Sequence, residues 1–168
     1  MPHSDNKQLK VEILDFKPKY ARYFSDINRN WLEEFFTVEP YDRIVLEDPE
    51  SEIIAHGGQV LFAKVEGEIV GTCALLKHTE SKFELAKMGV LKAYRGRGIG
   101  RKLAEAAIAK ALQTGADTLV LATSQNLEAA NALYHSLGFQ EVSFDEIGPL
   151  PYKRKSIVLR LQLEEKHG

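Results

Sequence analysis

The sequence has little of what several classes of protein require. Its 168 residues include a single cysteine, Cys73, which excludes an internal disulfide framework and a zinc site built from cysteines. No apolar run is long enough to span a membrane, and the polar N-terminus lacks the apolar core of a signal peptide. The formal net charge of −2 gives no basic field that would attract nucleic acid or an anionic membrane. We therefore expect a cytoplasmic protein without a metal site and without a nucleic-acid or membrane partner.

What the chain does contain suits one globular domain. Its length is sufficient for one sizeable core, and 44% hydrophobic with 27% charged residues is ordinary for such a domain. We find no internal repeat, low-complexity tract or linker that would divide it. The sequence therefore predicts a single domain over residues 1–168.

Hydrophobic periodicity predicts a mixed α/β domain. Strands are expected at residues 9–16, 59–65, 69–77, 82–91, 117–123, 139–144 and 155–163, and helices at 19–36, 99–116 and 127–138. Asn30 could divide the first helix in two. Residues 37–58 contain Pro40, Pro49 and a Gly57–Gly58 turn, so we expect them to be irregular.

A glycine-rich stretch, YRGRGIG, lies between the strand at 82–91 and the helix at 99–116. The N-terminus of a helix presents unpaired N–H groups that bind anions, and glycines let a phosphate approach the backbone closely. The dinucleotide pattern G-x-G-x-x-G fails because Arg101 occupies the third glycine position, and no G-K-[ST] follows for a phosphate-binding P-loop. The loop therefore predicts a cradle for another phosphate group.

The pattern that fits is R-x-x-G-x-G at residues 95–100. The stretch ELAKMGVLKAYRGRGIGRKLAEAAI resembles the acyl-CoA motif of the GNAT superfamily of N-acetyltransferases, and AANALYHSLGFQEV resembles its A-x-x-L-Y-x-x-x-G-F segment. The two motifs cover residues 83–142. The resemblance implies a mixed, mostly antiparallel sheet of about seven strands flanked by about four helices, with acetyl-CoA as acyl donor. It also implies a pyrophosphate cradle made of Arg95, Gly96, Arg97, Gly98, Ile99, Gly100 and Arg101.

The same resemblance assigns the pantetheine arm to the strand before the loop, at Met88, Gly89 and Val90. The apolar phase of that strand slips between Leu85 and Met88, which suggests a bulge. A glycine inside a strand marks a bulge or a close backbone approach, although Gly89 could serve packing alone.

An asparagine that contacts the pantetheine arm in many relatives is replaced here by Leu127. Asn126, one residue earlier, is a candidate for the same contact, although it could instead cap the following helix. Asn131, on that helix, is a second candidate.

Acetyl transfer to an amine requires a neutral amine, a stabilised oxyanion and a proton for the departing thiolate. Glu84 occupies a position where some relatives carry a catalytic glutamate or histidine, and we predict that it is the base. The alternative is a solvent-facing carboxylate, and His78 and His56 are weaker candidates. Tyr134 matches the tyrosine of the second motif, and its phenol stays protonated at pH 7, so it is the candidate acid. Its alternative role is core packing.

The resemblance places the acceptor site beside residues 31–52, where eight acids face one base, Arg43. Together with the local aromatic residues, this segment could attract a cationic amine, or it could be a solvated surface. The expected reaction is acetylation of the primary amine of a small molecule, and a cationic molecule is one candidate. A protein lysine or N-terminal acetyltransferase and a non-catalytic acyl-CoA sensor are the alternatives, and a homodimer is left open. The acids are Glu33, Glu34, Glu39, Asp42, Glu47, Asp48, Glu50 and Glu52.

Overall fold

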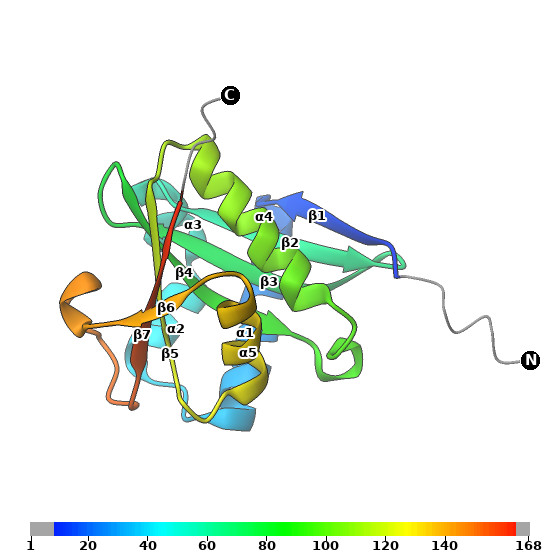
Figure 1. Cartoon of the computed structure of the whole chain (residues 1–168). Helices are drawn as coiled ribbons and strands as arrows, with labels where there is room; N and C mark the ends of the chain where they lie inside the picture. The colour runs from blue at the N-terminus through cyan, green and yellow to red at the C-terminus, as the bar shows by residue number, and fades with distance from the viewer. Residues whose placement is uncertain (1–8, 164–168) are drawn as a thin grey trace, which may run out of the picture.

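One seven-stranded mixed sheet, in the order β1-β2-β3-β4-β5-β7-β6, organises the molecule (Figure 1). The structure, a computed structural model, describes residues 9–163. All neighbouring strands are antiparallel except β4 and β5. The strands are β1 Val11–Asp15, β2 Gln59–Val65, β3 Glu68–Lys77, β4 Lys82–Val90, β5 Thr118–Thr123, β6 Gln140–Val142 and β7 Ile157–Gln162. The helices are α1 Ala21–Phe35, α2 Pro40–Glu47, α3 Pro49–Glu52, α4 Ile99–Gln113 and α5 Glu128–Ser136. The predicted fold class is confirmed.

Helices cover both faces of the sheet and form two apolar cores. In Figure 1, α4 crosses one face, while α1 and the two helices after it lie on the other. Successive residues of β2 serve opposite cores because side chains alternate along a strand. Leu61 packs in the core that includes Leu103 of α4, and Phe62 packs in the core that includes Phe24 of α1.

Most of the segment at residues 37–58 is helical, so the expectation of an irregular segment was wrong except for the turn at Gly57, which has a left-handed φ of 90°. The prolines read as breakers instead begin helices, because the first helical position needs no N–H donor. Pro40 is the first residue of α2, where the Glu39 and Asp42 side chains form a reciprocal capping box. Pro49 is the first residue of α3, and Asp48 caps it by accepting a hydrogen bond from the backbone of Ser51.

Other predicted boundaries also differ from the structure. Helix α1 continues through Asn30 without a break, because its apolar stripe packs against the sheet on both sides of that residue. Strand β6 ends at Val142, because Ser143 caps a short 3-10 turn with its side chain. The predicted end of α4 is confirmed, since Gly115 has a left-handed φ of 90° and Ala116 N donates back to Ala111 O.

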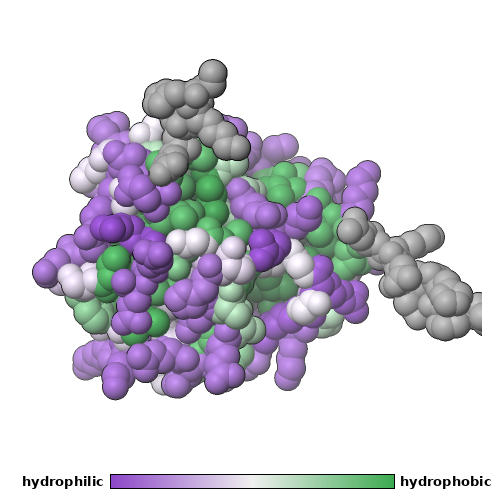
Figure 2. Space-filling model, viewed as in Figure 1, coloured by the Kyte–Doolittle hydropathy of each residue, from purple (hydrophilic) through white to green (hydrophobic). Residues whose placement is uncertain are grey.

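The outer surface is largely polar on the face viewed in Figure 2, with smaller apolar patches between hydrophilic side chains. Among residues 9–163, no helix is long and apolar enough to cross a membrane. In the same part of the chain, no group of three or more histidine, cysteine or acidic side chains is arranged to hold a metal ion.

Candidate active site

A cavity opens where β4 and β5 separate. The two parallel strands pair with each other only from Lys82 to Glu84 on β4 and from Thr118 to Val120 on β5, and beyond these residues β4 and β5 no longer pair with each other. The resulting cavity, about 740 Å³ in volume, continues past the start of α4 and along α5, and reaches α1 and residues 152–156 on the other side of β4. Its size suits an extended ligand.

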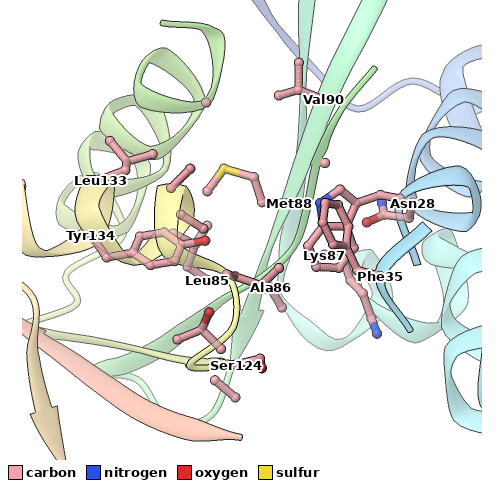
Figure 3. A pocket seen from close by; sticks show the side chains of 18 of the residues that line it. Asn28, Phe35, Leu85, Ala86, Lys87, Met88, Val90, Ser124, Leu133 and Tyr134 are labelled. Atoms are coloured by element: carbon pink, nitrogen blue, oxygen red, sulfur yellow. The ribbon is translucent and has the colours of Figure 1, made fainter. Parts of the chain in front are cut away.

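The predicted bulge in β4 lies in the wall of this cavity and is confirmed. The register between β3 and β4 shifts opposite Thr72 and Ala74, and Lys87 adopts a left-handed φ of 53°. Figure 3 shows the result: Met88 lies on the side of β4 that faces Tyr134, and Lys87 lies on the side of Asn28 and Phe35. The bulge thus gives the strand two functional faces.

The glycine loop has the geometry of an anion cradle. Gly96 and Gly98 adopt φ values of 77° and 82°, which favour glycine, and a Cβ atom at either position would meet no atom within 4 Å. Gly98 is the N-cap of α4, so the first N–H groups of that helix face the open space. Gly96, Gly98, Ile99 and Gly100 all line the cavity. These residues fit the pyrophosphate of CoA, and their individual roles stay predictions.

The three arginines of the loop differ in their contacts. Arg95 lines the cavity, but its Nη1 donates to both carboxylate oxygens of Glu34, at 3.0 and 2.9 Å, and its Nε donates to Val90 O. These hydrogen bonds hold the pKa of Glu34 below its usual value. Arg97 lies over the ring of Tyr94 and is not in the cavity wall.

Arg101 is part of the cavity wall and donates from Nη2 to Ser136 Oγ at the end of α5. Both residues are exposed, so Arg101 remains accessible to an anion at the helix start. Its predicted phosphate contact is compatible with this position.

The residues predicted to hold the pantetheine arm occupy different environments. Met88, Gly89, Val90 and Asn126 line the cavity, whereas Asn131 does not. Asn131 instead ties α5 to β5, accepting from Thr123 Oγ1 at 3.0 Å and donating to Ser124 O at 2.9 Å. A Cβ at Gly89 would lie 3.3 Å from Ile27 Cγ2, so this glycine also allows α1 to pack closely on β4.

Tyr134 lies on α5, where its ring is packed in the core and the residue also lines the cavity, while its role as the acid stays a prediction. Its ring packs edge-on against Phe139 at 5.8 Å between centroids, and the residue is only 8% exposed. Its hydroxyl points into the cavity toward Leu85 and Ala86 (Figure 3). Burial raises the pKa of Tyr134 well above its usual value, so the phenol stays protonated at neutral pH. It is thus available as a donor in the cavity.

Glu84 lines the cavity on β4, where the two strands begin to separate. Its Oε1 lies 2.7 Å from Nε2 of His78, which follows β3 in the chain. The Glu84 side chain is 15% exposed and that of His78 is 30% exposed. The pair therefore connects the cavity to solvent, and Oε2 of Glu84 has no hydrogen bond among the described residues. The assignment of Glu84 as the base stays a prediction.

The acidic segment does not form the cavity wall that its composition suggested. None of its eight acids lines the cavity. Asp42 is fully buried, and its oxygens accept from Glu39 N, Lys87 Nζ and Arg154 Nη2. Although burial opposes it, the charge of Lys87 and these hydrogen bonds hold the pKa of Asp42 below its usual value. An acidic acceptor wall is therefore not found. Four of the acids pair with basic side chains, namely Glu34, Glu39, Asp42 and Glu47. The other four are exposed, in agreement with the alternative of a solvated surface: Glu33, Asp48, Glu50 and Glu52.

Lys87, Tyr152 and Arg154 line the cavity in their place and were missed in the sequence. Lys87 Nζ donates to Asp42 Oδ1 at 2.9 Å and to the Tyr152 hydroxyl at 2.5 Å. The guanidinium of Arg154 stacks 4.1 Å from the Tyr152 ring centroid. The one signal for this cluster was the phase slip in β4, which turns Lys87 toward α1.

Comparisons with known proteins agree with this geometry. The model of the acetyltransferase (GNAT) family matches residues 21–139. The chain is 30% identical to the uncharacterized N-acetyltransferase YvbK of Bacillus subtilis (strain 168), over 64% of this chain and 71% of that protein. It is 32% identical to N-acetylaspartate synthetase of Xenopus tropicalis, over 71% of this chain but only 45% of that enzyme. Its fold is similar to that of yncA of Salmonella typhimurium, solved with its cofactor acetyl-CoA. The TM-score is 0.73 at 21% identity, with coverage of 94% of this chain and 96% of that chain.

Proposed function

Because the chain belongs to the acetyltransferase (GNAT) family and is an acetyl-CoA-dependent N-acetyltransferase, we propose that it acetylates the primary amine of a small molecule directly. The main support is the continuous cavity, which joins the glycine cradle to the Lys87 side of β4 past Glu84 and Tyr134. Both reactants can therefore meet without a covalent enzyme intermediate. Cys73 is fully buried, and burial raises the pKa of its thiol to about 12, so it offers no nucleophile.

Glu84 and Tyr134 supply the proton transfers in this proposal. Glu84 accepts the proton that the amine loses as its nitrogen bonds to the acetyl carbon, and His78 offers that proton a route toward solvent. As the bond from the acetyl carbon to sulfur breaks, Tyr134 donates its proton to the thiolate, which restores a neutral thiol. Acetyl-CoA supplies the activated acetyl group.

At the acceptor end of the cavity, around Lys87, residues 152–154 are held against α2, which favours a small molecule over a protein substrate. Glu39, the N-cap residue of α2, accepts from the backbone N–H groups of Lys153 and Arg154, at 2.9 and 3.3 Å. Arg154 also pairs with Asp42 of the same helix. These contacts hold residues 152–154 against α2, where a peptide substrate would need an open groove. The Xenopus relative is also named for a small-molecule product.

Release of free thiol from acetyl-CoA, measured over a panel of amines, amino acids and peptides, tests the proposal. We expect Glu84→Gln and Tyr134→Phe each to lower turnover by about 100-fold while acetyl-CoA still raises the melting temperature. Glu80→Gln, at an exposed acid, and Tyr23→Phe, at a partly buried tyrosine outside the cavity, are matched controls and should keep wild-type turnover. Binding of acetyl-CoA without turnover of any acceptor would instead indicate a sensor.

A further inference from the structure

At the acceptor end of the cavity, the acidic side chains of Glu39 and Asp42 already accept hydrogen bonds from the protein, whereas several hydrogen-bond donors are still available. The Asp42 oxygens already accept three hydrogen bonds, and both Glu39 oxygens accept from backbone N–H groups. Neither acid lines the cavity. A second positive charge on an acceptor molecule would therefore meet Lys87 and Arg154 rather than a free carboxylate.

Three donors at this end remain available. Lys87 Nζ has three N–H groups, of which two are directed at Asp42 and at the oxygen of Tyr152. Because that oxygen accepts from Lys87, the Tyr152 O–H is itself free to donate. Arg154 lines the cavity and uses Nη2 to bind Asp42, and its guanidinium carries further N–H groups. Three convergent donors, two of them charged, suit a carboxylate.

Glu84 lies close to this donor group. Burial lowers the pKa of Lys87 and raises that of Tyr152, and the negative charge of Glu84 raises both values. Glu84 and Lys87 also lie three positions apart on β4, and both line the cavity. One small molecule can therefore present its amine to Glu84 and a second group to the donors.

The remaining wall at this end is apolar. Trp31, Phe35 and Phe36 line the cavity from α1, and the Trp31 ring contacts both phenylalanine rings, with centroids 5.5 and 5.8 Å apart. Such a wall accommodates a side chain without a charge.

From these contacts we propose that the acceptor is an amino acid, whose amine is held at Glu84 and whose carboxylate is bound by Lys87, Tyr152 and Arg154. The inference rests on the proposed acetyltransferase function and narrows its acceptor to a molecule with both groups. The donors place the carboxylate, and Glu84 takes the ammonium end.

Matched acceptors test the inference without altering the protein. Each free amino acid with an apolar side chain is compared with its decarboxylated amine and with its amide, for example phenylalanine, phenethylamine and phenylalaninamide. We expect kcat/KM for the free acid to exceed that for the other two by at least about tenfold, since hydrogen bonds to a charged group are lost. Equal values, or a preference for the amine, would overturn the inference and leave the acetyltransferase proposal standing. If none of the three compounds and no member of the wider panel is acetylated, both the inference and the proposed function are overturned.

Substitutions of the donor residues test whether they cause the preference for the free amino acid over its amine. Tyr152→Phe keeps the ring under Arg154 and removes the O–H, and we expect KM for the amino acid to rise about fivefold with little change for the amine. Lys87→Met should raise the same KM further, whereas Tyr41→Phe and Lys153→Met, which alter a neighbouring ring and an exposed charge outside the cavity, should not. Melting temperatures measured on each variant separate binding from folding, and an unchanged acid-to-amine ratio in folded Tyr152→Phe and Lys87→Met would overturn the assignment.

Discussion

The two ends of the cavity are built by different means. At the donor end, the glycine loop at residues 94–100 and the first turn of α4 are continuous in sequence, and they bind through backbone conformation. At the acceptor end, Asp42, Lys87 and Arg154 come from three distant segments and meet through side-chain pairs. The donor end therefore depends on which residues permit a given φ, and the acceptor end depends on buried charges staying paired.

The largest expected effect comes from removing the central acid of the acceptor end. Asp42→Ala leaves Lys87 and Arg154 without their shared partner, and breaking a buried pair in this way costs about 3–5 kcal/mol of unfolding free energy. Urea unfolding at pH 7 measures the loss. Asp26→Ala, an exposed acid on α1, should change stability by less than about 0.5 kcal/mol. Similar values for the two variants would mean that the buried cluster does not stabilise the fold.

The difference in unfolding free energy between the wild type and Asp42→Ala should depend on pH. The pKa of Asp42 is lower in the folded protein than its usual value, so its stabilisation is fully present above about pH 4. It is lost as the pH falls through the lower folded value. The stability gap between the wild type and Asp42→Ala should therefore narrow as acid is added below that range.

An intermediate effect is expected at the donor end. Gly98 has a φ of 82° and open space around its Cβ position, so Gly98→Ala introduces backbone strain without a clash. Left-handed backbone in a residue with a Cβ costs about 1–2 kcal/mol, and we expect a loss of stability of that size together with weaker acetyl-CoA binding. Gly100→Ala is the matched control, because Gly100 lies inside α4 and its Cβ would be 3.7 Å from Leu133 Cδ2. Its effect on stability should be neutral or stabilising, and an equal loss of stability in both variants would contradict the backbone explanation.

The donor end depends on local backbone conformation and the acceptor end on long-range side-chain pairs, and this difference explains how much of each could be predicted from the sequence. Glycine spacing and a helix start are local rules, so the loop before α4, the bulge that precedes it and the helix end at Gly115 could be predicted. Asp42 was recognised as acidic, but its burial depends on Arg154, which lies 112 positions away in the chain. Partners at such separations follow from tertiary packing, which sequence patterns do not encode. Pro40 is a different case, because the rule that was missed is local. We interpreted this proline as the end of regular structure, but proline is also common at the first position of a helix.

Glu34 and Arg95 join the two ends, and a change at this contact has the smallest expected effect. Arg95 is predicted to bind pyrophosphate, yet in the structure its Nη1 donates to both oxygens of Glu34 on α1. Phosphate must therefore compete with Glu34 for the guanidinium. Because the ion pair is exposed and such pairs are weak, Glu34→Gln should tighten acetyl-CoA binding only by about two- to fivefold, as measured by calorimetry.

Glu33→Gln provides the control for this contact, because it removes the same charge from an exposed neighbour on the same helix. If only Glu34→Gln tightens binding, direct competition for Arg95 is the cause, and the gain should disappear when Arg95→Ala is added to the variant. Equal gains in both glutamine variants would assign the effect to the general field of α1. Weaker binding in Glu34→Gln would mean that Glu34 holds Arg95 in the orientation that phosphate requires, so that α1 assists the donor end rather than competing with it.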